Sequence, residues 1–343
     1  MGILGTGFGV TGHYPAWSAI DDVRIMGFAG RDEERASRIS REFSLPITKG
    51  TLDSLLASSD IKIVVVAVPP AAQPALIEAA LESGKHVFAE KPLTLSAETA
   101  LRLIKLAEHK SLYHGVNFCM RQAQASLTLR RALEAGLIGT PWRAVISWHR
   151  GYRAKEDLGW NWKCDARQGG GVMNAMGVHI LDLLIWMFSD VLYGHAVKHI
   201  HIPRRCDDMG REQAVTAEDA ISLMLTFANN MAAFVSLDST AIGGDGVRMD
   251  FYGSKGALHV RETSPQDAFA GFNVDVTDVH GRTETLLFHD SAKNEGRIGL
   301  VRDMAREFVK SIRENKPYSP SFGDGLKVVS VCQQLGLSSW GAV

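Results

Sequence analysis

Short apolar runs alternate with amphipathic stretches through the first third of the chain. The apolar runs lie at residues 1–4, 23–29, 61–68, 86–89 and 112–118, and the amphipathic stretches lie at residues 33–43, 71–83 and 96–110. Residues 61–68 are almost wholly apolar and rich in β-branched side chains, as a strand buried on both faces should be. This alternation of strand and helix predicts a doubly wound parallel sheet.

The pattern changes after residue 120. Helices are predicted at residues 122–135 and 169–188, a strand at 142–150, and closing helices at 297–315 and 325–340. Between residues 191 and 287 alternating runs recur, separated by turn signals such as Asn229-Asn230, which predicts a mainly antiparallel sheet. We therefore expect an α/β protein with a first domain at residues 1–120 and an α+β domain at residues 121–343. The closing helix is expected to pack back on the first domain.

The glycine-rich loop after the first strand has the spacing of a dinucleotide-binding turn. It comprises Gly5, Thr6, Gly7, Phe8 and Gly9, and the next helix would point its amino end at a phosphate. The third glycine of the fingerprint is replaced by Val10, so we expect looser packing of helix on strand there. A plain glycine-rich turn is the alternative for the loop taken alone.

The second strand ends without the carboxylate that usually binds the ribose 2′-hydroxyl of NAD. Gly30 stands where the acid is expected, and Arg31 follows it. An arginine can bind a 2′-phosphate through two hydrogen bonds, which favours NADP over NAD. In the alternative, Arg31 is only solvated and Asp32 caps the next helix.

Four stretches together resemble the Gfo/Idh/MocA oxidoreductases, the family of glucose–fructose oxidoreductase and inositol dehydrogenase. The stretches are GILGTGFG at residues 2–9, AVPP with SGKHVFAEKP within residues 67–92, GGGVMNAMGVHILD at residues 169–182 and PSFGDGL at residues 320–326. They span nearly the whole chain in the order that the family keeps. The resemblance implies a two-domain enzyme that transfers a hydride between a nicotinamide cofactor and a sugar-like or polyol substrate.

The resemblance and the strand ends together give the expected cofactor residues and Lys91 as the group that moves the substrate proton. The cofactor set is Gly5, Thr6, Gly7, Phe8, Gly9, Arg31, Val68, Pro69, Gln73, Glu90, Lys91 and Asn117. Lys91 follows a buried strand, at the edge where open α/β sheets bind ligands. A free lysine titrates near ~10.4, so the role requires surroundings that favour the neutral amine. Glu90 is expected to hold the backbone rather than to carry protons.

The helix after Gly171 carries the second group of expected catalytic and substrate residues. His179 and Asp182 are three residues apart and share a helix face. Position 175, one turn before His179, is aspartate in well-known family members and is Ala175 here. In a regular helix Asn174 points about 100° away, so it is no direct substitute. A satisfied core histidine is the alternative for His179.

The aromatic loop at residues 152–168 hints at the substrate. Five of the seven tryptophans fall between Trp142 and Trp186, and Trp162 and Lys163 could contact the face and the polar edge of a sugar. Core or interface packing explains the tryptophans equally well. We expect substrate contacts from Lys91, Trp162, Lys163, His179 and Asp182. Two other functions stay open: an NAD-dependent glycoside hydrolase, and a cofactor-binding sensor without catalysis.

Composition excludes several classes of partner. A net charge of −1 over 343 residues gives no electrostatic footprint for nucleic acid. The four cysteines have no CxxC spacing, so neither a disulfide framework nor a zinc site is expected. We therefore expect a cytoplasmic protein without bound metal. No run approaches the ~20 apolar residues that span a bilayer. By resemblance, the antiparallel sheet is expected to form a homodimer or homotetramer.

Overall fold

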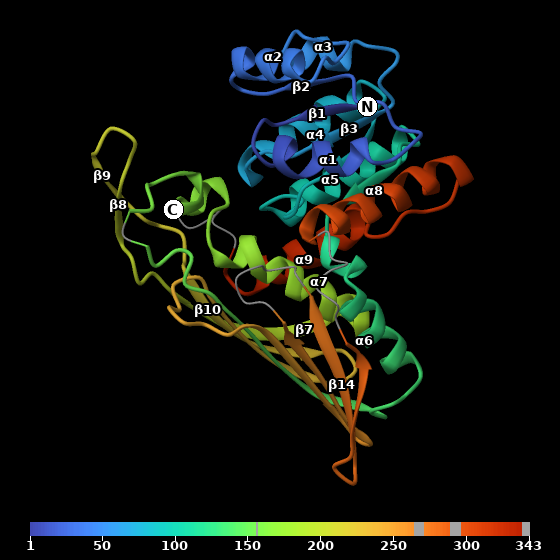
Figure 1. Cartoon of the computed structure of the whole chain (residues 1–343), viewed down its shortest axis with the longest axis vertical. Helices are drawn as coiled ribbons and strands as arrows, with labels where there is room; N and C mark the ends of the chain where they lie inside the picture. Colours follow the sequence, from blue (N-terminus) through green and yellow to red (C-terminus); the bar gives the residue numbers. More distant parts are fainter. Residues whose placement is uncertain (156, 264–270, 289–295, 338–343) are drawn as a thin grey trace. The chain divides into compact units, whose positions relative to one another are not determined.

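The computed structural model describes residues 1–155, 157–263, 271–288 and 296–337, which form two compact units (Figure 1). The first unit combines Met1–Cys119 with Ile298–Ser330, and the second combines Met120–Arg297 with the chain from Val331. The predicted closing helices therefore contribute mainly to the first unit. Each unit has its own sheet.

The first unit contains a five-stranded parallel sheet in the order β2-β1-β3-β4-β5. Its strands are β1 (Gly2–Leu4), β2 (Gly27–Ala29), β3 (Ile63–Val66), β4 (His86–Ala89) and β5 (His114–Val116). The order reverses at β1, as in doubly wound sheets, so the predicted fold of this half is confirmed. β4 has the bounds of the apolar run that predicted it, and the other four strands are shorter than their runs.

Helices connect these strands and cover the sheet. They are η1 (Gly9–His13), α1 (Tyr14–Ser18), α2 (Glu33–Glu42), α3 (Leu52–Leu56), η2 (Pro70–Ala72), α4 (Gln73–Glu82), α5 (Ala97–His109), α8 (Gly296–Glu314) and α9 (Phe322–Gln334). Side chains of Asp32 and Ser96 cap α2 and α5 by accepting backbone N–H groups. The sequence did not predict α3. The core packs Trp17, Phe28, Phe88 and Phe308 with aliphatic side chains of β1, β3 and α8.

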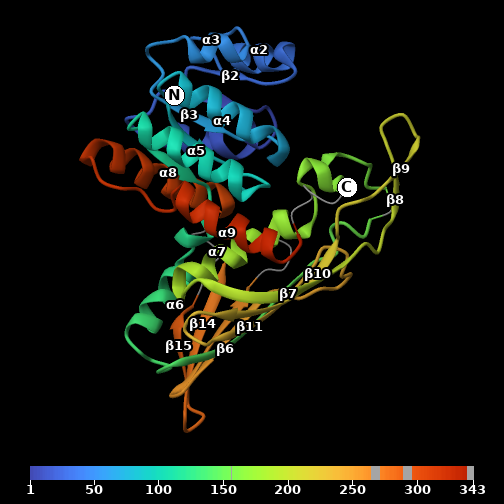
Figure 2. The same cartoon turned by 180° about the vertical axis from the view of Figure 1, so that it is seen from behind.

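The second unit contains an eight-stranded sheet in the order β15-β14-β13-β12-β6-β11-β10-β7. Its strands are β6 (Pro141–His149), β7 (Val191–His199), β10 (Ala220–Phe227), β11 (Ala232–Asp238), β12 (Gly246–Gly253), β13 (Gly256–Glu262), β14 (Phe272–Asp278) and β15 (Thr283–Leu287). The pairing is antiparallel except between β11 and β6, which confirms a mainly antiparallel sheet. A two-stranded arm, β8 (Arg204–Cys206) and β9 (Glu212–Ala214), extends from it (Figure 2).

Helices α6 (Gln124–Glu134) and α7 (Val178–Met187) lie on one face of the eight-stranded sheet, as both views show (Figures 1 and 2). Among the described residues of this unit, no helix covers the opposite face. The chain before α7 is less regular than predicted: it contains 3₁₀ turns η4 (Trp162–Cys164) and η5 (Ala166–Gln168) and a π-helix, η6 (Met173–Gly177). The predicted helix at 169–188 is therefore a π-turn followed by a regular helix.

The segment Ala166–Met187 is long and apolar enough to cross a membrane by length and composition alone. In the structure, 72% of its most apolar window is buried within the protein, as in the core helix of a globular domain.

Candidate functional site

The glycine-rich loop combines two tight contacts with one open position. Gly5 has φ +116°, and a Cβ there would collide with the carbonyl oxygen of Ala67. A Cβ at Gly9 would lie 3.0 Å from Ile3, whereas one at Gly7 would meet nothing within 4 Å. Gly9 thus gives the close approach of helix to strand that we expected to be weakened at Val10. Gly7 leaves the exposed space over its backbone that a pyrophosphate requires.

The end of β2 presents cationic side chains near this loop. Arg31 is exposed, and the carboxylate of Asp32 accepts the N–H of Arg35 at 2.9 Å, so Asp32 serves as the cap of α2. The guanidinium of Arg35 donates to the carbonyl of Thr6 at 3.3 Å. Arg35 was not identified from the sequence, although it lies four residues after Arg31, in the first turn of α2.

Glu90, Lys91 and Pro92 follow β4 and are held by a buried amide. The Nε2 of Gln73 donates to the carbonyls of Glu90 at 2.9 Å and of Pro92 at 2.6 Å. Lys91 is half-buried, and its backbone N–H donates to Oε2 of Glu90 at 3.3 Å. Glu90 is itself 7% exposed. The Glu90 carboxylate thus contacts the neighbouring backbone, and the role predicted for it stays a prediction.

Asn117 and Gln73 present two buried acceptors in this region. The Nδ2 of Asn117 donates to Oε1 of Glu90 at 2.6 Å. Because the partners of both amide nitrogens are acceptors, the amide orientations are fixed by chemistry. Among the described residues, Asn117 Oδ1 and Gln73 Oε1 are buried without a hydrogen-bond partner. Such oxygens are costly unless a donor reaches them, so they fit the N–H and O–H donors of a nicotinamide carboxamide and ribose.

The remaining predicted cofactor residues lie in the loops that follow β1 and β3. Val68 and Pro69 are half-buried and lie two and three residues after the end of β3. Thr6 and Phe8 are half-buried in the glycine-rich loop. The first unit therefore brings the predicted cofactor residues together at the carboxyl ends of β1 to β5, the edge that binds ligands in open α/β sheets.

In the second unit, the glycine-rich segment before α7 packs closely against the carboxylate of Glu218. Gly171 has φ +102°, and a Cβ there would collide with the Glu218 carboxylate. The N–H of Met173 donates to Oε1 of Glu218 at 3.0 Å. Burial raises the pKa of Glu218, although this hydrogen bond opposes the rise. Glu218 was not identified from the sequence, because it lies 45 residues after Met173.

The π-turn changes the geometry expected around His179. The N–H of Val178 donates to the carbonyl of Met173, five residues earlier. In such a segment a turn holds more residues than in an α-helix, so the rotation from one residue to the next is smaller. The π-turn changes the rotation between Asn174 and His179, and the expectation that Asn174 is no direct substitute for a carboxylate at position 175 stays a prediction. Asn174 is half-buried and Ala175 is exposed.

His179 and Asp182 are both 2% exposed on α7. Asp182 forms a buried ion pair, in which Arg121 Nε donates to Oδ2 at 2.8 Å and Nη2 to Oδ1 at 2.6 Å. The sequence did not single out Arg121. Asp182 thus has a structural partner, and its predicted contact with substrate stays a prediction.

Arginines hold the loop that carries Trp162 and Lys163. Arg153 donates from Nη1 and Nη2 to the Lys163 carbonyl, both at 3.2 Å. Arg205, on the β8–β9 arm, donates to the carbonyls of Lys155 at 3.0 Å and Leu158 at 2.9 Å. Desolvation of the Lys163 amine, then repulsion from Arg153 and Arg297, lowers its pKa. The loop thus presents a lysine that gives up its proton more easily than usual.

The described residues contain no group of three or more metal-ligating side chains that could hold a metal ion. What the first unit presents is a dinucleotide-type loop, a strand-end lysine and buried acceptors, the components of a nicotinamide-dependent oxidoreductase. The model of the oxidoreductase family with an NAD-binding Rossmann fold matches residues 1–118, and the Gfo/Idh/MocA C-terminal domain matches residues 126–259. The chain belongs to the Gfo/Idh/MocA oxidoreductase family.

Similar proteins match this chain over nearly its full length. An uncharacterised oxidoreductase from Synechocystis sp. is 29% identical over 95% of this chain and 90% of its own. Levoglucosan dehydrogenase from Pseudarthrobacter phenanthrenivorans is 23% identical over 99% of this chain and 97% of its own. A solved structure of levoglucosan dehydrogenase with NADH and L-sorbose has a TM-score of 0.85 at 22% identity, covering 98% of this chain and 95% of that one, which shows the shared fold.

Proposed function

We propose that the protein is an NAD(P)-dependent dehydrogenase or reductase that acts on a hydroxyl or ketone of a sugar-like or polyol substrate. The observation that carries the proposal is the cluster at Glu90-Lys91-Pro92. Lys91 is half-buried there, and the two amides that bind Glu90 and Pro92 each keep a buried oxygen without a partner among the described residues. Levoglucosan dehydrogenase and inositol 2-dehydrogenase, both similar to this chain, are named for substrates of this class.

The cofactor would supply the hydride chemistry at its nicotinamide ring. Gly7 would admit the pyrophosphate, and the oxygens of Gln73 and Asn117 would accept hydrogen bonds from the nicotinamide half. Lys91 would move the proton of the substrate hydroxyl, as general acid–base lysines do. His179 would orient the substrate oxygen, and Trp162 and Lys163 would bind the face and the edge of the sugar.

A substrate screen tests this function. Purified protein is incubated with NAD⁺ or NADP⁺ and a panel of sugars, polyols and anhydrosugars, and reduced nicotinamide is followed by absorbance. We expect turnover with at least one of them, and the reverse reaction with the matching ketone. Cofactor binding without turnover on the whole panel would favour the sensor, and release of product from a glycoside without net cofactor change would favour the hydrolase.

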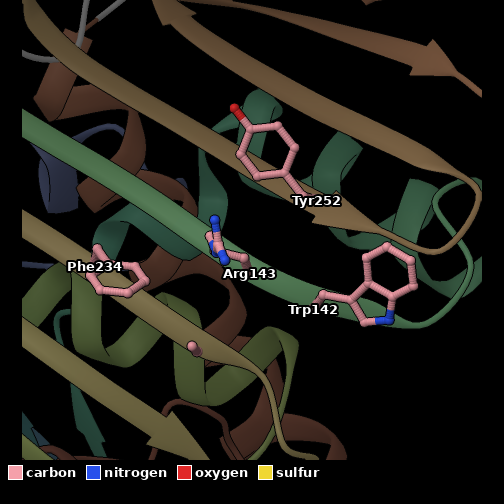
Figure 3. Close-up of a pocket in the computed structure, with 5 residues that line it drawn as sticks. Trp142, Arg143, Phe234 and Tyr252 are labelled. Atoms are coloured by element: carbon pink, nitrogen blue, oxygen red, sulfur yellow. The ribbon is translucent and has the colours of Figure 1, made fainter.

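The exposed face of the eight-stranded sheet supports a homo-oligomer as part of the proposal. Met224, Phe234 and Val145 lie directly opposite one another on β10, β11 and β6, and they are 55%, 39% and 40% exposed. Beside this row is a hollow lined by Trp142, Arg143, Phe234 and Tyr252 with Ala232 (Figure 3). A contiguous exposed apolar patch marks an interaction surface, and an isologous dimer would cover it with the same face of a second copy.

Light scattering tests the oligomer. Phe234→Glu should lower the measured mass toward that of one 37.4 kDa chain. Leu101→Glu is a matched control, because Leu101 is also exposed, at 43%, but lies on α5 of the first unit. A wild-type protein of one-chain mass would contradict the proposal.

We also propose that the protein works in the cytoplasm on a small molecule, without nucleic acid or a membrane as partner. The net charge of −1 and the four free cysteines support this location. A reporter fusion followed by cell fractionation tests it, and recovery in the membrane fraction would contradict it.

A further inference from the structure

A chain of buried polar groups runs behind Glu90, outside the predicted cofactor set. His13 and Trp17 are both fully buried in η1 and α1, directly after the glycine-rich loop. The Nε2 of His13 lies 2.9 Å from Oε1 of Glu90, and the Nε1 of Trp17 lies 3.3 Å from Nδ1 of His13. No part of the proposed reaction yet uses these two residues.

The chemistry of Trp17 fixes the protonation of His13. An indole N–H can only donate, so Nδ1 of His13 must accept and cannot carry a proton. The single proton of the neutral imidazole therefore lies on Nε2, which donates it to the Glu90 carboxylate. His13 is a neutral histidine locked in one tautomer, in the way that a second partner usually selects the tautomer of a functional histidine.

Glu90 transmits this contact to the groups around it. Its Oε1 accepts from both His13 and Asn117, and its Oε2 accepts the backbone N–H of Lys91. A buried carboxylate stays in place only while donors satisfy it. If the His13 donor is lost, Glu90 keeps the donors from Asn117 and Lys91 but loses its contact with the helix after the glycine-rich loop, so its carboxylate is held less firmly and its contacts with the Lys91 backbone and the Asn117 amide shift.

We propose that His13 is a positioning residue, which through Glu90 fixes the Lys91 backbone and the Asn117 amide for the nicotinamide end of the cofactor. The inference rests on the proposed function for its kinetic consequence. Its consequence for cofactor binding does not depend on which substrate is turned over.

Two variants separate the hydrogen bond from the packing. His13→Met keeps an apolar side chain of similar length in the ring contacts with Phe8 and Phe88 but removes the donor. His13→Gln retains an amide N–H that can reach Glu90. Val301→Ala is the control. Val301 is fully buried in the core cluster that also contains Trp17 and Phe88, and its truncation leaves the donors to Glu90 in place.

We expect His13→Met to lower kcat by roughly 10- to 100-fold, the usual result of misplacing a reacting group by a fraction of an ångström to an ångström. Its Kd for the reduced cofactor, measured by fluorescence titration, should rise by about 3- to 10-fold, as for one lost neutral hydrogen bond. His13→Gln should recover most of both losses. Val301→Ala should lower the Tm without changing the ratio of kcat to KM or the cofactor Kd by more than about twofold.

Equal losses in His13→Gln and His13→Met, or an unchanged cofactor Kd in His13→Met, would overturn the inference. If the wild type binds cofactor but turns over no substrate, the proposed function fails while the titration still decides the role of His13. If Val301→Ala raises the cofactor Kd as much as His13→Met, the effect belongs to general core packing and the inference fails.

Discussion

The guanidinium of Arg121 holds both carboxylate oxygens of Asp182 in a buried pair, with Nη2 and Oδ1 2.6 Å apart. Arg121 also lies over the ring of Trp186, 5.4 Å from its centroid. The two residues are 5% and 2% exposed at their side chains, so neither charge has water to replace its partner. The pair therefore joins the start of the second unit to the helix that carries His179.

Asp182→Asn should destabilise the protein by about 3–5 kcal/mol, because it leaves a buried guanidinium without its counter-charge. Arg121→Met combined with Asp182→Leu should recover much of that loss, since an apolar pair of similar volume needs no partner. Thermal unfolding followed by circular dichroism measures both. An Asp182→Asn variant of normal Tm but raised KM would instead support the predicted contact of Asp182 with substrate.

Much of the fold could be predicted because its signals are local. Continuous apolar runs marked the strands, and glycine spacing marked the cofactor loop. The partners of functional residues could not be predicted, because they come from distant segments: Arg121 precedes Asp182 by 61 residues, and Glu218 follows Met173 by 45. The π-turn before His179 has no sequence signal of its own. His13 could have been singled out as a histidine in the first helical turn after the glycine-rich loop, but its partner Glu90 lies 77 residues away.

Lys91→Ala should lower turnover by about 10²-fold or more while changing cofactor affinity much less. The reason is that a general acid–base group contributes mainly to the chemical step. Steady-state kinetics on the best substrate, with cofactor titration alongside, measure both quantities. Lys85→Ala is a control from the same segment. Lys85 precedes β4, whereas Lys91 follows it, and the Lys85 amine donates to the Ser58 carbonyl at 2.8 Å. Near-normal turnover in Lys91→Ala would contradict the role of Lys91 as the proton-transfer group.

Arg31→Ala should weaken NADP binding by roughly 10- to 150-fold and leave NAD binding nearly unchanged, as expected for a lost charge-assisted contact. Arg35→Ala should act in the same direction, because Arg35 reaches the carbonyl of Thr6 in the cofactor loop. Arg38→Ala is the matched control, since Arg38 is an exposed residue of α2 that pairs with Glu42 at 3.8 Å. Calorimetric titration of each variant with both cofactors measures these changes in affinity. A wild type that prefers NAD would contradict the role of Arg31.

Glu218 should make stability depend on pH in a defined direction. Burial raises its pKa above the ordinary 4.5, so the folded protein binds this proton more tightly than the unfolded chain does. The stabilisation is fully present below pH 4.5 and is lost as the pH rises through the raised pKa. Glu218→Gln should flatten this decline, because the amide oxygen can still accept the Met173 N–H and no charge is buried. Chemical unfolding at a series of pH values measures it, with the exposed Glu212→Gln as control, and an unaltered slope in Glu218→Gln would contradict the assignment.

Variants of Ala175 and Asn174 test whether Asn174 serves in place of the aspartate that the family resemblance implies at position 175. Ala175 is exposed, and a methyl group can neither accept a hydrogen bond nor hold a histidine tautomer. Asn174 lies in the π-turn, and its amide donates to the Gly170 carbonyl at 3.4 Å. We expect Asn174→Ala to lower kcat/KM by about 2- to 10-fold, the range for a lost neutral hydrogen bond.

Ala175→Asp should bring no gain on the native substrate, because Ala175 is exposed and a pairing between solvated charges contributes little. The measurement is kcat/KM for the wild type and both variants on the best substrate found, with Ala175→Ser as a control for size. A large gain in Ala175→Asp would show that the native protein is a weakened form of the ordinary enzyme, which would favour the cofactor-binding sensor. An unchanged Ala175→Asp together with a weakened Asn174→Ala would mean that the amide on the π-turn serves this site in place of the carboxylate.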